Sequence, residues 1–294
     1  MRVTNRMLME TILANIHRNV EALDRTQHQV SSGKRVTRPG EDPVAAGLGV
    51  RLRTERGAQD QYLRNIDQAR TWLAATDQAL GEASNTLQRI RELAVQAAND
   101  TYGAADRATI SKEVDQLRDH LIDTLNSTIL GDQYIFAGMK TTTAPFSKDV
   151  AGNAVYNGDS NTVAREIGPG VTIPVNVDGS TFLTTLADLK SLADALADPL
   201  STSAQISGLL TNLDADADLV LATRAEVGAK LNRLDFMQDR LNDLVVEVGR
   251  LQSANEDVDL ADALLRLSTQ EAVLRASLQI GARTAAMSIL DFLK

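Results

Sequence analysis

The sequence predicts a mainly α-helical protein, a long helical bundle or coiled coil with a small β-rich inserted domain. Both ends of the 294-residue chain carry apolar residues at coiled-coil spacing. Aromatic residues make up only 3% of the chain, and this composition, with abundant Ala and Leu, favours helix–helix packing. Four of the six prolines lie between residues 141 and 200, among short runs rich in β-branched residues.

The two terminal stripes advance by alternating steps of four and three residues. The first stripe consists of Ile12, Ile16, Asn19, Leu23, Thr26 and Val30, and the second of Leu260, Leu264, Leu267, Glu271, Leu274 and Leu278. A single amphipathic helix is marginal in water because nothing covers its stripe. We therefore expect the two ends to meet and further copies of the chain to complete the burial. Ordinary helical bundles show the same spacing over a few turns, so the pattern alone leaves a bundle and a polymerising protein both open.

The first helix is expected to run from about residue 4 to Ser32. Gly33 should end it, since glycine readily adopts the left-handed conformation that closes a helix. A loop rich in helix breakers follows, and Asp42-Pro43 predicts the next helix start. The Asp carboxylate can cap free backbone N–H groups, and Pro is pre-set for the first helical position.

Two further helices are expected before the inserted domain. One spans about residues 44–99, and four of its apolar residues lie seven apart: Ile66, Leu73, Leu80 and Leu87. Tyr102-Gly103 interrupts the pattern. The next helix spans about residues 105–130 and should end at Gly131.

Short β-branched runs then predict strands at residues 154–156, 161–167 and 171–177. Helix is expected again over residues 183–197 and from 203 to about 253, where Leu231, Leu234, Leu241, Val248 and Leu251 form its stripe. A polar interruption precedes the terminal stripe.

The predicted domain organisation is nested. Residues 1–42 with 256–294 form a terminal coiled-coil assembly domain, and residues 43–140 with 203–255 form a helical body domain. Residues 141–202 form the β-rich outer inserted domain. Because this insertion leaves and rejoins the same body, we expect the helical body to survive removal of residues 145–200.

No catalytic residue, cofactor site or metal site is predicted, which argues against an enzyme. The chain has no Cys, and His17, His28 and His120 lack the spacing of metal ligands. Residues 214–218 alternate Asp and Ala like the start of a calcium loop, but a leucine stands where that loop requires Gly. Residues 47–49, Gly-Leu-Gly, lack the third glycine and the preceding strand of a dinucleotide site.

Charge and hydropathy favour neither nucleic acid nor membrane as a partner. Residues 1–40 carry a net charge of +4 and the remainder −13, so most of the chain would repel phosphate. No stretch approaches the roughly 18 apolar residues of a membrane span. The first residues lack the continuous apolar core of a secretory signal, so we expect no cleaved signal peptide.

Several segments resemble the helical domain shared by bacterial flagellins and hook-associated proteins. They are residues 4–8 (TNRML), the loop motif with Ser32 and Gly33 in SSGKRV and Asp42 and Pro43 in EDPVAA, residues 131–138 (GDQYIFAG), 156–159 (YNGD) and the two C-terminal segments 258–262 and 288–293. Flagellins usually read Asp-Asp-Ala-Ala-Gly in the loop, and Asp42-Pro43 is more similar to the hook–filament junction branch of this family. Glu41 replaces the usual first Asp of that branch, a conservative departure.

The resemblance implies a mechanical function. Proteins of this branch are exported through the flagellar type III apparatus, with an export chaperone on the C-terminal region. They lie outside the cell at the hook–filament junction, between the first hook-associated junction protein and flagellin, and contact their own copies in a ring-like junction. Their terminal helices form an inner tube and the insertion lies outermost. A short or minor flagellin is the main alternative, and an enzyme, a metal-binding module or a cytoplasmic helical scaffold are the others.

Overall fold

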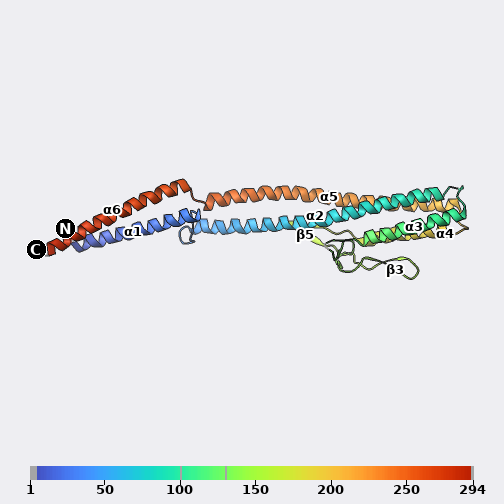
Figure 1. Ribbon diagram of the computed structural model, residues 1–294, viewed down its shortest axis with the longest axis horizontal. Coiled ribbons are helices and arrows are strands. Elements are labelled where there is room, and N and C mark those ends of the chain that lie inside the picture. Colours follow the sequence, from blue (N-terminus) through green and yellow to red (C-terminus); the bar gives the residue numbers. More distant parts are fainter. Residues whose placement is uncertain (1–4, 100, 130, 293–294) are drawn as a thin grey trace. The chain divides into compact units, whose positions relative to one another are not determined.

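The computed structural model describes residues 5–292 except 100 and 130, without the side chains of residues 5, 6, 8 and 284–292. The helices are α1 (Asn5–Ser32), α2 (Pro43–Ala97), α3 (Ala104–Leu125), α4 (Phe182–Ala197), α5 (Ser203–Glu256) and α6 (Leu260–Phe292). The strands are β1 (Thr128–Ile129), β2 (Gln133–Tyr134), β3 (Phe146–Lys148), β4 (Ala154–Tyr156), β5 (Ala164–Gly168) and β6 (Val171–Pro174). Figure 1 shows these elements, and the predicted fold class is confirmed.

The chain forms two compact units. The first contains the described residues up to Ala58 and from Leu244 onward, and the second runs from Gln59 to Asp243. In the second unit, α2 and α5 lie antiparallel, as ion pairs along their length show: Arg70–Asp235, Asp77–Arg224 at 2.9 Å and Arg91–Asp214 at 2.6 Å.

A heptad pattern on both helices explains the α2–α5 pairing. The predicted α2 stripe is fully buried, and α5 contributes apolar residues seven apart, all at most 3% exposed: Ile206, Leu213, Val220, Val227, Leu234 and Leu241. A strict seven-residue repeat keeps one seam facing the partner helix. The predicted α5 stripe was partly wrong, because Leu251 is 44% exposed.

The helix α4 lies on α3 and completes the core of the second unit. Four of its leucines are buried (Leu186, Leu189, Leu192 and Leu196), and the Ser111 hydroxyl donates a 2.8 Å hydrogen bond to the carbonyl of Ala193. The short 3-10 helix Gly179–Thr181 leads into α4, where the rings of Phe136 and Phe182 meet edge-on. Because α4 lies within residues 145–200, the structure argues against our expectation that this whole segment can be removed from the helical body.

The strands form three separate antiparallel pairs: β1–β2, β3–β4 and β5–β6. The predicted strand at residues 154–156 is β4, and the two later runs contain β5 and β6. β1, β2 and β3 were not predicted. The insertion is anchored at Tyr156, whose hydroxyl lies 3.0 Å from the carbonyl oxygens of Phe136 and Asp159.

The third helix is shorter than predicted. It ends at Leu125 rather than near residue 130, and Gly131, with φ +88°, lies in the β1–β2 turn. The reason lies 20 residues away. The Asn126 side chain exchanges two 2.9 Å hydrogen bonds with the backbone of Phe146, so Asn126 is paired with β3 instead of continuing the helix.

Candidate assembly site

The terminal helices α1 and α6 lie side by side and antiparallel, and we call this pair the terminal coil (Figure 1). The prediction that the two ends of the chain meet is confirmed. At one level Gly281 of α6 faces Ile12 and Ile16, where a Cβ would lie only 3.3 Å from Ile12 Cγ2. Farther along, Asn19 Nδ2 donates a 3.0 Å hydrogen bond to Ser277 Oγ. Small and polar residues thus let the two backbones approach closely.

The predicted stripe of α1 faces the interior of the terminal coil. Ile12, Ile16, Leu23 and Val30 are half-buried, and Thr26 between them is 5% exposed. Thr26 Oγ1 donates to the carbonyl of Ala22, so burial leaves no unpaired hydroxyl hydrogen.

The predicted stripe of α6 is divided between two directions. Leu267 and Leu274 are half-buried, on the line of sheltered residues that continues through Ala263, Gln270, Ser277 and Gly281. Leu260, Leu264 and Leu278 are instead 50%, 52% and 51% exposed. The helix therefore presents one stripe to α1 and a second, adjacent stripe to solvent.

Exposed apolar residues concentrate in the first unit. Fifteen of the 22 large apolar residues that are exposed among the described residues lie there, although it is the smaller unit. Those on the terminal coil are Met7, Leu13, Val20, Leu260, Leu264, Leu265, Val273, Leu278 and Ile280. Exposed apolar side chains at this density are typical of an interaction site.

The two linkers that join the terminal coil to α2 and α5 meet and pass each other in an antiparallel pairing. They are residues 33–42 and 257–259, and we call this place the linker crossing. Gly33, with φ +69°, ends α1 as predicted. Its carbonyl accepts a 3.0 Å hydrogen bond from Val258 N, and Arg35 N donates to Glu256 O at 2.6 Å. The linkers are therefore paired like a short antiparallel ladder.

The loop residues singled out in the sequence have local structural roles. Ser32 Oγ accepts from the backbone N–H of Lys34 at 3.2 Å. Asp42 Oδ1 accepts from Ala45 N at 3.0 Å and caps α2, which begins at Pro43 as predicted. This hydrogen bond is the main reason that the pKa of Asp42 lies below its usual range.

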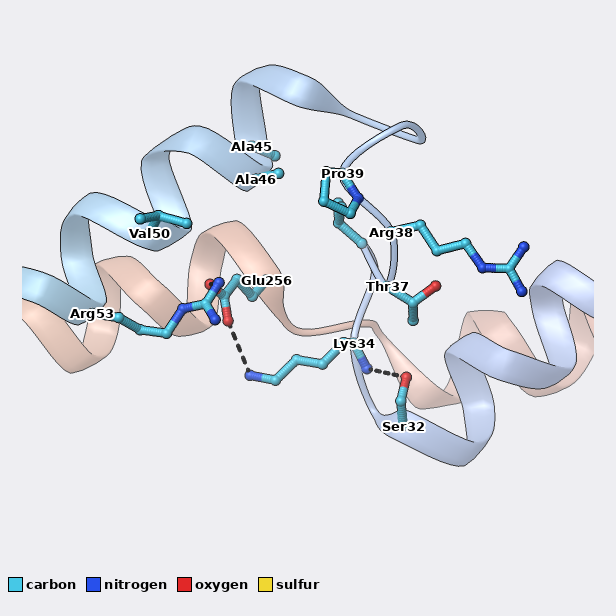
Figure 2. A pocket seen from close by; sticks show the side chains of 11 residues that line it. Ser32, Lys34, Thr37, Arg38, Pro39, Ala45, Ala46, Val50, Arg53 and Glu256 are labelled. Carbon is cyan, nitrogen blue, oxygen red and sulfur yellow. Dashed lines mark hydrogen bonds and ion pairs between the residues drawn. The ribbon is translucent and has the colours of Figure 1, made fainter.

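Charged side chains cover the linker crossing (Figure 2). Lys34 Nζ lies 2.7 Å from Asp257 Oδ1 and 3.5 Å from Glu256 Oε2, and Arg53 Nη2 lies 3.2 Å from Glu256 Oε1. Lys34 and Ser253 each donate a hydrogen bond to the Asp257 carboxylate, and these bonds hold the pKa of Asp257 below its usual range. The same contact with Asp257 raises the pKa of Lys34. A cavity of about 510 Å³ lies beside these groups.

Sequence reasoning missed the residues that hold the crossing together, namely Lys34, Gly49, Arg53, Glu256 and Asp257. Their signal is weak, because they are common residue types far apart in the chain. Gly49 did draw notice as part of Gly-Leu-Gly, and the structure gives it another explanation: a Cβ there would lie 2.1 Å from Glu256 Oε1.

Neither a metal-binding cluster nor a membrane-spanning helix is found in the described part of the chain. It holds no group of three or more His, Asp or Glu side chains placed to bind a metal ion. None of the helices, as far as they are described, has the length and hydropathy to cross a membrane.

Comparison with known proteins finds similarity to bacterial flagellar proteins. Residues 3–141 match the family of bacterial flagellin N-terminal helical regions. The N-terminal half of this chain is a flagellin-type helical region. Over most of its length this chain is similar to flagellar hook-associated protein 3 of Escherichia coli K12, with 27% identity over 94% of this chain and 95% of that protein. It is also similar to Flagellin FlaB1 of Treponema pallidum, with 25% identity over 95% of this chain and 94% of that protein.

A solved structure shows the same fold. Flagellar hook-associated protein 3 of Legionella pneumophila superimposes with a TM-score of 0.65, covering 69% of this chain and 97% of that one, at 17% identity. The fold, the exposed terminal coil and the sequence similarity all point to a structural protein of the bacterial flagellum.

Proposed function

We propose that this chain is a structural subunit of the hook–filament junction. It would bind the first hook-associated junction protein on one side and flagellin on the other, and contact its own copies in a ring-like junction. The observation that carries the proposal is the similarity to hook-associated protein 3 along almost the full length of both chains. The exposed stripe of the terminal coil supplies the surface that such contacts need.

The proposed division of labour follows the nested domains. Residues 1–42 with 256–294 assemble, and residues 43–140 with 203–255 form the helical body. Residues 141–202 face outward, apart from α4, which packs in the core of the second unit. Leu260, Leu264 and Leu278 would contact neighbouring subunits, while Leu267 and Leu274 hold α6 to α1. Covering a half-exposed leucine is worth about 1 kcal/mol, so the stripe as a whole can hold a subunit in place.

Export is the second part of the proposal. The chain would leave the cell through the flagellar type III apparatus without a cleaved signal peptide, with an export chaperone on its C-terminal region. The support is physical: the terminal coil gains much of its burial only from neighbours. A segment of this kind is ordered most fully upon assembly, when the added burial offsets the ordering entropy.

Deletion of the gene tests the junction function. We expect cells that build a hook but no filament and release flagellin into the medium, because flagellin then lacks a surface of terminal helices on which to assemble. Electron microscopy of the cells and assay of the supernatant give the answer. Filaments of normal length on the hooks of the deletion strain would overturn the proposal.

A short or minor flagellin is the second candidate, and the similarity to Flagellin FlaB1 favours it. Labelling the protein on intact flagella separates the two functions. A junction subunit marks one point at the base of the filament, whereas a flagellin marks the filament along its length. Filament formation by the purified chain alone would also favour the flagellin function.

A further inference from the structure

The carboxylate of Glu256 is the most sheltered charge at the linker crossing. Its side chain is 12% exposed, whereas Lys34 and Arg53, the cations that face it, are 40% and 59% exposed. Its Oε1 atom is buried and accepts no hydrogen bond of good geometry. The charge is therefore held by two cations that come from different segments, the first linker and α2 (Figure 2).

Gly49 provides the space that this carboxylate occupies. A Cβ at Gly49 would lie 2.1 Å from Glu256 Oε1, so the carboxylate would have to move from its place between Lys34 and Arg53. At Gly47, two residues earlier on the same helix, a Cβ would meet nothing within 4 Å. Glycine inside a helix costs stability relative to alanine. The contact with Glu256 therefore explains glycine at position 49, whereas no contact explains it at position 47.

The backbone beside Glu256 carries the contacts between the linkers. Its carbonyl accepts the hydrogen bond of Arg35 N, and two residues later Val258 N donates to Gly33 O. One residue earlier, Asn255 Nδ2 donates to the carbonyl of Ala45 at 2.8 Å, which ties the end of α5 to the start of α2. Glu256 thus lies among all three connections.

We propose that Glu256 is a positioning residue that holds the two linkers crossed. Its carboxylate sits against Gly49 between Lys34 and Arg53. Loss of the charge, or of the space at Gly49, releases the linkers while the second unit stays folded. The inference concerns the free subunit and does not depend on the junction function.

Amide hydrogen exchange on the full-length protein tests the proposal, with Arg35 N and Val258 N as reporters. In Glu256→Gln and in Gly49→Ala we expect both amides to exchange at least about tenfold faster. Glu256→Gln removes the charge that pairs with Lys34 and Arg53, and Gly49→Ala fills the sheltered space that the carboxylate occupies. Amides of α2 between residues 66 and 90 should not change. Gly47→Ala is the matched control and should leave Arg35 and Val258 unaffected. Unchanged exchange at the reporters in Glu256→Gln would overturn the proposal.

A double variant keeps the test decisive if Gly49→Ala disturbs α2 by itself. In a Glu256→Ala background the added methyl group has room, so Gly49→Ala should add little to the exchange rates there. Equal effects in both backgrounds would show that Gly49 acts through helix structure and would overturn its role. High salt should speed reporter exchange in the wild type more than in Glu256→Gln, since screening weakens the exposed cations.

Discussion

The carboxyl group of Asp216 lies in the core of the second unit, between α5 and α4. Asp216 is 5% exposed, and Thr185 Oγ1 donates to its Oδ1 at 2.7 Å. The other oxygen has no hydrogen-bond partner. Burial raises the pKa of Asp216 to about 6, and the charge of nearby Asp188 adds to the effect. The group is thus held in a place that favours its protonated form.

This burial predicts a pH dependence of stability. An acid whose pKa is higher in the folded than in the unfolded protein binds its proton more readily when folded. The contribution of Asp216 to the free energy of unfolding therefore falls as pH rises from about 4 through about 6. Between pH 5 and 7 the free energy of unfolding of the wild type should fall by about 1 to 2 kcal/mol through this group, and we expect Asp216→Asn to lack that fall. Urea unfolding over this range measures it.

The control for this prediction is Asp218→Asn, the same substitution on the exposed side of the same helix. It should follow the wild-type pH profile. Carboxylates with lowered pKa values, such as Asp257 and Asp42, act at lower pH, because their contribution is lost only as pH falls below their usual range. A pH profile of Asp216→Asn parallel to the wild type between pH 5 and 7 would refute the assignment.

At the level of elements, α4 belongs with the helices rather than with the strands around it in the sequence. Its buried face includes Leu186, Leu189 and Leu192, and these residues share one core with α3 and α5. Fully burying a leucine is worth about 1.5 to 3 kcal/mol, so the loss of α4 would expose a substantial apolar face.

Two deletions separate these contributions. Replacing residues 145–178 with a short Gly/Ser linker retains α4, and we expect a cooperative helical transition with a moderate loss of melting temperature, since β-strand residues such as Ile167 and Ile173 leave the core. Replacing residues 145–200 should lower the melting temperature much further or abolish cooperativity. Circular dichroism at 222 nm follows both. Equal melting temperatures would mean that α4 contributes little to the core.

At the scale of the whole molecule, burial is uneven. The second unit contains a continuous apolar core, whereas many apolar residues of the first unit remain exposed. A chain of this kind is stable through one part and available for contacts through the other.

Substitution of an outward-facing leucine separates folding from assembly. Leu278 is 51% exposed, so Leu278→Asp should change the free energy of unfolding by no more than about 0.5 kcal/mol, as is usual for surface changes. In an assembled subunit the same carboxylate would be buried without a partner, at a cost of about 1–3 kcal/mol or more. We therefore expect loss of incorporation into flagella, read by labelling on isolated filaments.

Gln279→Asp provides the matched control, because it introduces the same charge on the neighbouring exposed position. Normal incorporation of Leu278→Asp would show that the outward stripe of α6 makes no subunit contact. A large drop in its melting temperature would show instead that Leu278 supports the pairing of α6 with α1.

The sequence by itself determined the features that depend on neighbours along the chain. Gly33 ends α1 and Asp42-Pro43 begins α2 because capping is local. The α2 stripe, whose residues lie seven apart, is buried as predicted because helical periodicity sets which side chains share a face. The flagellin-type loop and termini were also readable, since they are contiguous motifs.

Only the tertiary structure decided the features that depend on distant partners. The third helix ends at Leu125 because Asn126 pairs with Phe146. Leu267 and Leu274 are half-buried, whereas Leu260, Leu264 and Leu278 are exposed, since α6 turns toward α1 the face on which Gly281 meets Ile12 and Ser277 bonds Asn19. The contact between Gly49 and Glu256 joins residues about two hundred positions apart. No periodicity along the chain encodes such contacts, since they arise from packing of elements that fold separately.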